Sequence, residues 1–389
     1  MPVVLIWLRE LMQSCRRIVR CCLRVRLVKN MTKTLFTPGR TELAGNHTDH
    51  QNGRVLAAAI DRGISADFEA NGGKVVHIQS SETGTFELRL DHLSPRTAEF
   101  GTSKALARGV IAAFYELGLK IGGFDAVIRS ALPIGVGLSS SAAFSVLIGK
   151  ILNELFNGGE VDPVVIARAA QSAENTFFGK PCGLMSQLTC ALGKTIYVDF
   201  ADNSVEPVVA DFEGMGLTLC LTDTGGSHAD LSTSYARIPA DMVYVANLFD
   251  KGLLGDVDPQ AFLAKGWDPA NRPVRRAMHF FEENARVPLM RDALKNRDGA
   301  AYMRLMNESG RSSEELLNNI VTSATGDTKL EQGLALSRKL LEGRGAWRVH
   351  GGGFAGCVQA LMPSELFPDY KTEMEKSFGK GKCVKIRLL

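Results

Sequence analysis

Polar side chains crowd one short stretch near the start of the chain, GRTELAGNHTDHQNG at residues 39–53. They are Arg40, Glu42, Asn46, His47, Asp49 and His50. A sugar needs many fixed hydrogen-bond donors and acceptors at once, and such a density supplies them, although a solvated polar turn also explains the pattern. The imidazoles and the aspartate suggest a metal site as well, but so few candidate ligands without a matching cysteine make this the weaker hypothesis.

A second stretch, PIGVGLSSSAA at residues 133–143, combines glycines with serines. Gly135 and Gly137 allow a tight turn and the close approach of a ligand to the backbone. Ser139 and Ser141 fall at the start of an expected helix, where free N–H groups and the helix dipole favour an anion such as phosphate. The stretch is neither GxxxxGKS/T nor GxGxxG, so a serine-capped turn without a ligand remains the alternative.

A third stretch, RVHGGGFAGCVQAL at residues 348–361, places four glycines before an apolar strand. They are Gly351, Gly352, Gly353 and Gly356. Glycines beside a strand free the backbone to pass close to a ligand. Close packing of two backbone segments explains the same glycines equally well.

The length, composition and charge of the chain are those of an ordinary globular protein. The 389 residues are long for one hydrophobic core and predict two domains. The chain is 45% hydrophobic and 22% charged, values that exclude extended disorder. Residues 1–30 hold seven Lys and Arg against one acid, and the remainder has 38 basic and 41 acidic residues, so the charge balance predicts no nucleic-acid partner.

Eight cysteines show neither CxxC pairs nor the density of a disulfide scaffold, which fits a reducing compartment and predicts a cytoplasmic protein. No apolar run approaches the roughly 20 residues of a membrane span, so no membrane partner is expected. Residues 1–30 mix apolar and Arg positions at helical spacing, which suits a membrane-surface helix or a transit peptide. We favour a non-native extension or dispensable tail, because Met31 opens MTKTLFTPGR just before the first motif.

Hydrophobic periodicity predicts two α+β domains, at residues 31–205 and 206–389, with a cleft between them. In the first domain we expect an antiparallel sheet of strands at 54–60, 64–70, 74–80 and 85–91, then a helix at 102–118 and a strand at 123–132. A helix after the glycine and serine turn, a helix at 163–178 and a strand at 195–200 complete it. In the second we expect strands at 217–226, 357–362 and 383–389, and helices at 240–250, 273–308, 311–320 and 327–342.

The three stretches, in this order and spacing, resemble the GHMP small-molecule kinase family. The first stretch narrows the likeness to the galactokinases, whose signature is approximately GRxNLxGEHTDYNxG, and TDTGGSHADLSTSYARIPADM at residues 222–242 resembles their segment that opens the second domain. The likeness covers residues 34–389. It implies a two-domain α+β fold, with a ribosomal protein S5 domain 2-like N-terminal domain, a ferredoxin-like C-terminal domain and the active site in the cleft.

The resemblance also implies an activity, the ATP-dependent phosphorylation of the anomeric hydroxyl of galactose to galactose 1-phosphate, by a monomer whose partners are galactose and ATP. It assigns catalysis to Arg40, and to Ser186 at the position of an expected aspartate. It assigns the sugar to Asn46, His47, Asp49, Gly183 and Tyr235. It assigns the binding of Mg²⁺ to Ser141 and Glu174. It assigns the binding of ATP to Gly135, Gly137, Leu138, Ser139, Ser140, Ser141 and Ala142.

Two positions depart from the family pattern. Asn46 replaces a glutamate, exchanging an anionic acceptor for a neutral amide where we expect the sugar's outer hydroxyls, so altered affinity or sugar choice is expected. Ser186 replaces the aspartate of CGxMDQ, in PCGLMSQ at residues 181–187, and a serine hydroxyl is a far weaker base than a carboxylate. General-base assistance contributes about 10² to 10⁴ in rate, whereas positioning and charge neutralisation persist without it.

The resemblance therefore implies a galactokinase of normal or reduced activity, since Ser186 replaces the expected base. Relay of the proton through a water to Asp49 or to bulk solvent is a hypothesis that the sequence itself does not support directly. Two alternatives stay open: a sensor that binds galactose and ATP without turnover, and a GHMP kinase for another sugar. An assay of ADP release across a panel of sugars separates the three.

Overall fold

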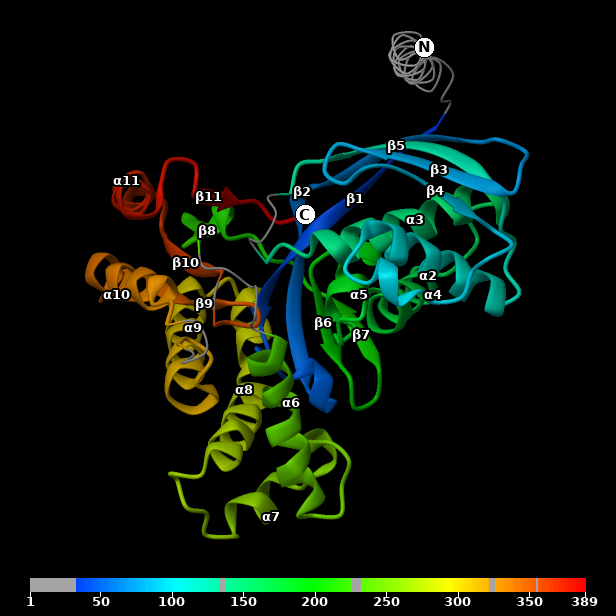
Figure 1. Ribbon diagram of the computed structural model, residues 1–389. Coiled ribbons are helices and arrows are strands. Elements are labelled where there is room, and N and C mark those ends of the chain that lie inside the picture. The colour runs from blue at the N-terminus through cyan, green and yellow to red at the C-terminus, as the bar shows by residue number, and fades with distance from the viewer. Residues whose placement is uncertain (1–32, 133–136, 226–231, 322–325, 355) are drawn as a thin grey trace, which may run out of the picture. The chain divides into compact units, whose positions relative to one another are not determined.

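The structure is a computed structural model that describes residues 33–132, 137–225, 232–321, 326–354 and 356–389 (Figure 1). The chain divides into two compact units. The first comprises the described part of Met1–Thr37 with Ile64–Ala131 and Phe144–Lys180, and the second comprises the described parts of Pro38–Gly63, Leu132–Ala143 and Pro181–Leu389. The domain limits at residues 31, 205 and 206 are a different division and stay a prediction, and the extension at residues 1–30 lies outside the described residues.

The first unit contains a mixed sheet. Strands β4 (Gly84–Arg89), β3 (Val75–Ser80), β5 (Phe124–Ser130) and the C-terminal part of β2 (Arg54–Ala70) pair in that order. The pairs β3–β4 and β2–β5 are antiparallel, but β3 and β5 are parallel. The expected wholly antiparallel sheet is therefore wrong, because the chain crosses over through α2 (Ser103–Glu116) after β4 and returns in the direction of β3.

Two helices of the first unit begin where their sequences provide caps. The Thr102 side chain accepts a hydrogen bond from the Ala105 backbone at the start of α2. Asp162 caps α4 (Pro163–Ser172) in the same way, with a proline in its first turn. The predicted helix continues past α4 as a π-type stretch, η3 (Ala173–Phe178), so its last turns are wound differently from its first.

The second unit is built on two sets of strands. The N-terminal part of β2 pairs with β6 (Ile196–Asp199), which pairs with β7 (Ser204–Pro207). The strands expected at 54–60 and 64–70 are one continuous strand, β2. An antiparallel four-stranded sheet has the order β11 (Cys383–Ile386), β8 (Leu217–Asp223), β10 (Cys357–Pro363) and β9 (Ala346–His350).

Two long helices, α6 (Ser232–Asn247) and α8 (Arg272–Lys295), pack against each other in the second unit (Figure 1). Further helices are α3 (Ser140–Phe156), α5 (Met185–Leu192), α7 (Pro259–Leu263), α9 (Gly299–Ser312), α10 (Lys329–Leu341) and α11 (Phe367–Phe378), and shorter turns include η1 (Asp49–Gln51) and η6 (Ser313–Leu317). The single helix predicted at 273–308 is wrong. Arg297 has a left-handed φ of 54° and Asp298 then caps α9, so the chain forms two helices instead of one.

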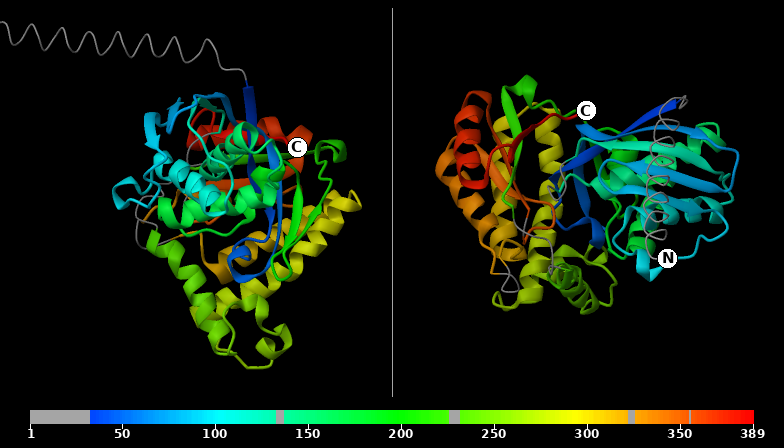
Figure 2. Two further views of the ribbon diagram at one scale, coloured as in Figure 1. Left: turned by 90° about the vertical axis from the view of Figure 1, so that its right-hand side faces the viewer. Right: turned by 45° about the horizontal axis from the view of Figure 1, so that its top comes forward.

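The two faces of the four-stranded sheet bury different kinds of side chain. Ala360 and Trp347 are register partners on one face, against which α10 and α11 pack (Figure 2). Their neighbours Gln359 and Arg348 are partners on the opposite face, because successive strand residues alternate sides. Both are 1% exposed and donate to the Glu42 carbonyl, so this face of the sheet places a buried polar pair against β1 (Lys33–Ala44).

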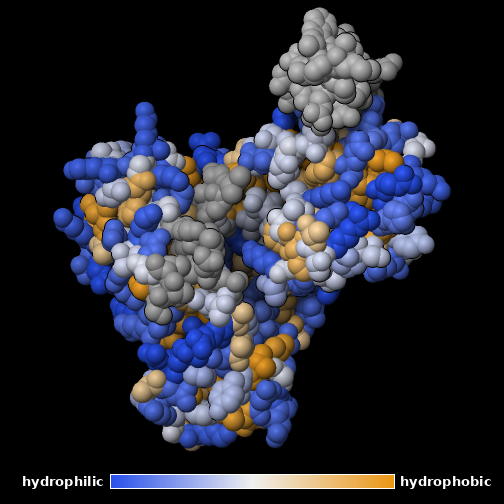
Figure 3. Space-filling view, in the orientation of Figure 1, coloured by the Kyte–Doolittle hydropathy of each residue, from blue (hydrophilic) through white to orange (hydrophobic). Residues whose placement is uncertain are grey.

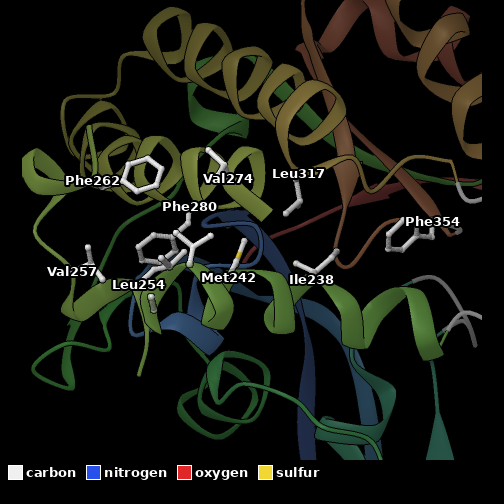
Figure 4. Close-up of a cluster of buried hydrophobic side chains, with 12 residues drawn as sticks. Ile238, Met242, Leu254, Val257, Phe262, Val274, Phe280, Leu317 and Phe354 are labelled. Atoms are coloured by element: carbon white, nitrogen blue, oxygen red, sulfur yellow. The ribbon is translucent and has the colours of Figure 1, made fainter. Parts of the chain in front are cut away.

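A hydrophobic cluster fills the space between α6 and α8 (Figure 4). Ile238 and Met242 of α6 pack there with Val274 and Phe280 of α8. Phe354, which directly follows Gly351, Gly352 and Gly353 within the third stretch, lies at one end of the cluster beside Ile238 and is 4% exposed. Burial of an aromatic ring contributes several kcal/mol, so Phe354 anchors the glycine turn that precedes it.

The face seen in Figure 3 is mostly hydrophilic, with hydrophobic residues in small groups among polar ones. Among the described residues, no helix combines the length and the apolar character needed to span a membrane.

Candidate active site

Arg40, in the first polar stretch, contacts two other predicted parts of the site, the glycine and serine turn and Ser186. It lies on β1 (Lys33–Ala44), which pairs with β2, and it is 9% exposed. Its Nε donates to Ser186 Oγ at 3.0 Å, and its Nη1 donates to the Gly137 carbonyl at 2.6 Å. Its backbone N–H donates to the Leu138 carbonyl at 3.3 Å. One cation therefore contacts both the glycine and serine turn and the start of α5, all within the second unit.

Ser186 lies in the first turn of α5. Its Oγ accepts from Arg40 and, at 3.1 Å, from Ser139 Oγ. Ser139 has a φ of 58°, which is uncommon for a residue other than glycine, and α3 begins at the next residue. The hydroxyl that replaces the expected aspartate therefore stands between a cation and the predicted phosphate turn.

The predicted ATP-binding turn is described in part, since Gly135 lies outside the described residues. Leu138 and Ala142 are each 1% exposed, so their side chains lie in the interior. Ser140 and Ser141 are partly exposed in the first turn of α3, where N–H groups lack partners within the helix. These features suit an anion, and the binding of ATP here stays a prediction.

Asp49 faces the backbone of Gly183. Its Oδ1 accepts from the His50 backbone N–H at 2.9 Å, and a Cβ added at Gly183 would overlap its carboxylate. Burial raises the pKa of Asp49, and His47, the His50 N–H and Arg40 offset part of that rise. A carboxylate with a raised pKa is a better proton acceptor than an ordinary one, so Asp49 has the chemistry of a weak general base.

Gly183→Ala is expected to weaken galactose binding about tenfold, because the added methyl group displaces the Asp49 carboxylate. Titration calorimetry with galactose measures the effect. Gly252→Ala is the matched control, since a Cβ there meets nothing within 4 Å and Gly252 has no left-handed φ. Equal galactose affinities of Gly183→Ala and the parent would show that this contact does not shape the sugar site.

Two histidines form a directional chain of hydrogen bonds. His50 Nδ1 accepts from Gln51 Nε2 at 3.2 Å, so its Nε2 carries the proton and donates to His47 Nδ1 at 3.1 Å. His47 Nε2 then donates to the Gly352 carbonyl at 3.1 Å. Burial lowers the pKa of His47 to about 3 and that of His50 to about 4, so both rings are neutral. Both nitrogens of His47 have protein partners, and its contact with sugar stays a prediction.

Three consecutive carbonyls of the third glycine stretch accept hydrogen bonds from side chains. Asn46 Nδ2 donates to Gly351 at 2.6 Å, His47 Nε2 to Gly352 at 3.1 Å and Tyr235 Oη to Gly353 at 2.6 Å. Gly352 also packs on the Tyr235 ring, where a Cβ would lie 2.6 Å from Cε1. Three residues predicted to bind the sugar therefore hold this turn in place.

Asn46 is 1% exposed and surrounded by protein partners. Its Nδ2 also donates to Glu42 Oε1 at 3.3 Å, and its Oδ1 accepts from Asn319 Nδ2 at 3.2 Å and from Ser313 Oγ at 3.4 Å. A glutamate accepts hydrogen bonds but has no N–H to donate to Gly351 or to Glu42. The replacement of glutamate by asparagine thus supplies a donor for the glycine turn, while a contact with the sugar's outer hydroxyls stays a prediction.

Asn46→Asp is expected to lower Tm by about 4 °C or more, because it removes this donor and sets a second carboxylate beside Glu42. Calorimetry measures Tm, and hydrogen exchange of the peptide around Gly351 should rise. Asn71→Asp is the matched control, since Asn71 Nδ2 also donates to a carbonyl (Val75, 3.0 Å) and a carboxylate (Asp125, 2.7 Å), but at an exposed site. Similar Tm changes in both variants would show that the buried hydrogen bonds of Asn46 contribute no more to stability than the exposed ones of Asn71.

Two residues of α8 that the sequence did not single out form hydrogen bonds with the backbone of the first polar stretch. Glu283 is fully buried and accepts from the Asn46 backbone N–H at 3.4 Å and from that of the preceding glycine at 3.1 Å. His279, one turn earlier, donates to the Asn46 carbonyl at 2.9 Å. Burial alone would raise the pKa of Glu283, but Arg286, His279 and Arg348 together lower it, so its carboxylate stays charged. Polar residues at helical spacing within a buried helix face were the available signal.

The predicted metal ligands offer oxygen donors. Ser141 lies in the first turn of α3, and Glu174 lies on η3. Glu174 is 3% exposed, with Lys180 Nζ at 3.9 Å from its carboxylate. Hydroxyl and carboxylate oxygens are the donors that Mg²⁺ prefers, so the chemistry of both residues fits that ion. Within the described residues, no group of three or more His, Cys, Asp or Glu side chains is arranged to hold a metal ion.

Known proteins share both the motifs and the fold. Residues 105–194 match the GHMP kinases N terminal domain, and residues 29–66 match the galactokinase galactose-binding signature. The fold is similar to that of Lactococcus lactis galactokinase complexed with galactose, at 22% identity and a TM-score of 0.80 over 93% of this chain and 95% of that chain. It is also similar to Methanococcus jannaschii mevalonate kinase, at 16% identity and a TM-score of 0.66 over 93% of this chain and 99% of that chain.

A third similar structure is Streptococcus pneumoniae phosphomevalonate kinase in complex with phosphomevalonate and AMPPNP, at 16% identity and a TM-score of 0.61 over 92% of this chain and 98% of that chain. These likenesses confirm the predicted two-domain α+β GHMP kinase fold. The galactose-binding signature spans Arg40 and Asp49, and the N-terminal domain match spans the glycine and serine turn and Ser186. The chain therefore carries an N-terminal domain of the GHMP kinases together with the galactose-binding signature of galactokinases.

Proposed function

We propose that this protein transfers the γ-phosphoryl group of ATP to the anomeric hydroxyl of galactose, giving galactose 1-phosphate and ADP. The observation that carries the proposal is Arg40, whose guanidinium bridges Ser186 and Gly137 of the predicted phosphate turn. The galactokinase signature around Arg40 supports galactose as the sugar.

Arg40 acts on the charge that develops during transfer. A bond forms between the sugar's anomeric oxygen and the γ-phosphorus, the bond from that phosphorus to the bridging oxygen breaks, and the hydroxyl proton leaves. A fixed cation beside these atoms lowers the barrier because it offsets the growing negative charge. Asp49 and Gly183 orient the sugar. Ser141 would offer a hydroxyl to Mg²⁺, which when bound neutralises charge on the phosphates, and Glu174 stays a predicted ligand.

The proton leaves by a slower route than the family pattern provides. Ser186 Oγ already accepts from Arg40 and Ser139, and a hydroxyl is a weak base. Asp49, whose pKa is raised by burial, receives the proton through a water, or bulk solvent receives it. Loss of a general base lowers the rate by about 10² to 10⁴, so we expect a slow kinase.

Ser186 also favours a second candidate function, a sensor that binds galactose and ATP without transferring phosphate. Such a protein keeps its binding groups and lacks the proton acceptor. The two candidates make opposite predictions about ADP.

An assay of ADP release over a panel of hexoses, run beside thermal shift with each ligand, tests the proposal. ADP release with galactose above the other sugars supports the kinase. A rise in Tm with galactose and ATP, but no ADP, refutes the kinase and supports the sensor. ADP release with another sugar alone refutes galactose as the substrate.

A further inference from the structure

His350 is a buried histidine that the proposed mechanism leaves without a role. It is the last residue of β9, directly before the glycine turn, and it is 3% exposed. Its Nε2 accepts from the Glu42 backbone N–H at 3.4 Å and lies 3.0 Å from the Thr41 hydroxyl. Because a backbone N–H can only donate, Nε2 must be the acceptor of this ring.

The neutral ring therefore carries its proton on Nδ1. Burial, with Arg40 and Arg348 nearby, holds the pKa of His350 well below its usual range, which excludes a second proton on the ring. Nδ1 is buried and has no hydrogen-bond partner in the part of the chain that the structure describes. Leaving a buried donor without a partner is energetically unfavourable, so an N–H of this kind marks the place of an acceptor.

The unpartnered Nδ1 lies against the predicted phosphate turn. A Cβ added at Gly137 would lie 3.0 Å from it. The same turn is contacted by the Arg40 guanidinium and leads into the start of α3. A guanidinium, an N–H donor and the first turn of a helix each favour an anion, and here they are grouped around one turn.

We propose that His350 Nδ1–H donates a hydrogen bond to a phosphate oxygen held at the turn of Gly137 to Ser139. The inference rests on the proposed function in one respect, that the anion is the polyphosphate of a nucleotide. Arg40 supplies charge at this turn, whereas a neutral N–H at a fixed position supplies direction. His350 is thus a ligand that aligns the phosphate chain.

Two variants separate the two ring nitrogens. His350→Gln places an amide near the position of Nε2, so it keeps an acceptor for Glu42 but lacks the donor at Nδ1. His350→Asn places an amide nitrogen near the position of Nδ1, so it keeps the donor. Both variants lose packing and part of Tm, which makes each the stability control of the other.

Titration calorimetry on the full chain, with sodium tripolyphosphate as the probe and no sugar, measures the role of Nδ1. We expect His350→Gln to raise the Kd of tripolyphosphate about tenfold, the value of one hydrogen bond to a charged acceptor. We expect His350→Asn to stay within about threefold of the parent, and both variants to bind galactose as the parent does. In a ¹⁵N-histidine-labelled sample, the Nδ1–H resonance of His350 should move on addition of tripolyphosphate.

Several results would overturn the assignment. An unchanged Kd in His350→Gln, an equal loss in both variants or an unmoved resonance refutes the phosphate contact. A loss of galactose affinity larger than the loss of tripolyphosphate affinity shows that the donor serves the sugar. If the parent protein binds no tripolyphosphate, both this inference and the proposed function are refuted. If the parent binds tripolyphosphate only as tightly as His350→Gln does, the inference alone is refuted.

Discussion

Arg40→Ala is expected to lower kcat about 10³-fold, measured as ADP release at saturating galactose and ATP, because a fixed cation on a transferring phosphoryl group contributes about 10³ to 10⁵. The variant also leaves Ser186 Oγ without its Arg40 donor and the Gly137 carbonyl without the N–H group that it now accepts from. Affinity for galactose should change far less than kcat, because the proposed contribution of Arg40 grows in the transition state.

Two further arginine variants test the cause of this loss. Arg40→Lys keeps the charge but not the planar fork that reaches Ser186 and Gly137 together, so it should recover only part of the rate. Arg54→Ala is the matched control, since Arg54 lies in the same unit and pairs with Asp199 at 2.7 Å, away from Arg40's partners. An Arg40→Ala protein that keeps more than about a tenth of the parent kcat contradicts the proposed role.

Ser186→Asp is expected to raise kcat about 10²-fold, at the lower end of the range for general-base assistance. The new carboxylate would meet Arg40 Nε, which lies 3.0 Å from Ser186 Oγ, so the ion pair should lower the aspartate's pKa and keep it ionised near neutral pH. The same ion pair should leave Tm close to that of the parent. The assay is ADP release with galactose across a pH series.

Ser186→Asn controls for size and polarity, because its amide resembles the carboxylate in shape but takes no proton. No rise in kcat is expected for it. Asp49→Asn should slow the parent more than it slows the Ser186→Asp protein, if Asp49 is the proton acceptor that now compensates. A gain of less than about tenfold in Ser186→Asp would show that a missing base does not limit the rate. A silent parent that gains ADP release identifies a sensor that lost its base.

Most secondary-structure elements followed from local patterns, and the errors have identifiable causes. The hydrophobic run of α8 and α9 was expected as one helix, because Arg297 and Asp298 are a weaker stop signal than a glycine or a proline. The parallel pairing of β3 with β5 depends on where the chain returns after α2, and periodicity within a strand carries no information about its neighbours.

Some residues of the candidate site could likewise be identified from the sequence, and others could not. Residue types and glycine spacing singled out Arg40, Asp49 and Ser139, and Arg40 and Ser139 share Ser186 as a hydrogen-bond partner. The sequence did not single out Glu283 or His350, because each becomes informative only through a partner far away in the chain. Asn46 looked like a contact for sugar hydroxyls until its partners, Glu42 and the glycine turn among them, were known.

Local sequence patterns were sufficient to identify the GHMP kinase resemblance, the fold class and the three polar and glycine-rich stretches, because these depend on residues a few positions apart. Which atoms are free for a ligand depends on the folded structure. Thr41 and His350 are 309 positions apart, yet their contact and that of the Glu42 N–H leave Nδ1 as the donor. Whether a donor or acceptor already has a hydrogen-bond partner depends on the folded structure. The sequence shows which donors and acceptors are present, but not which of them are already paired.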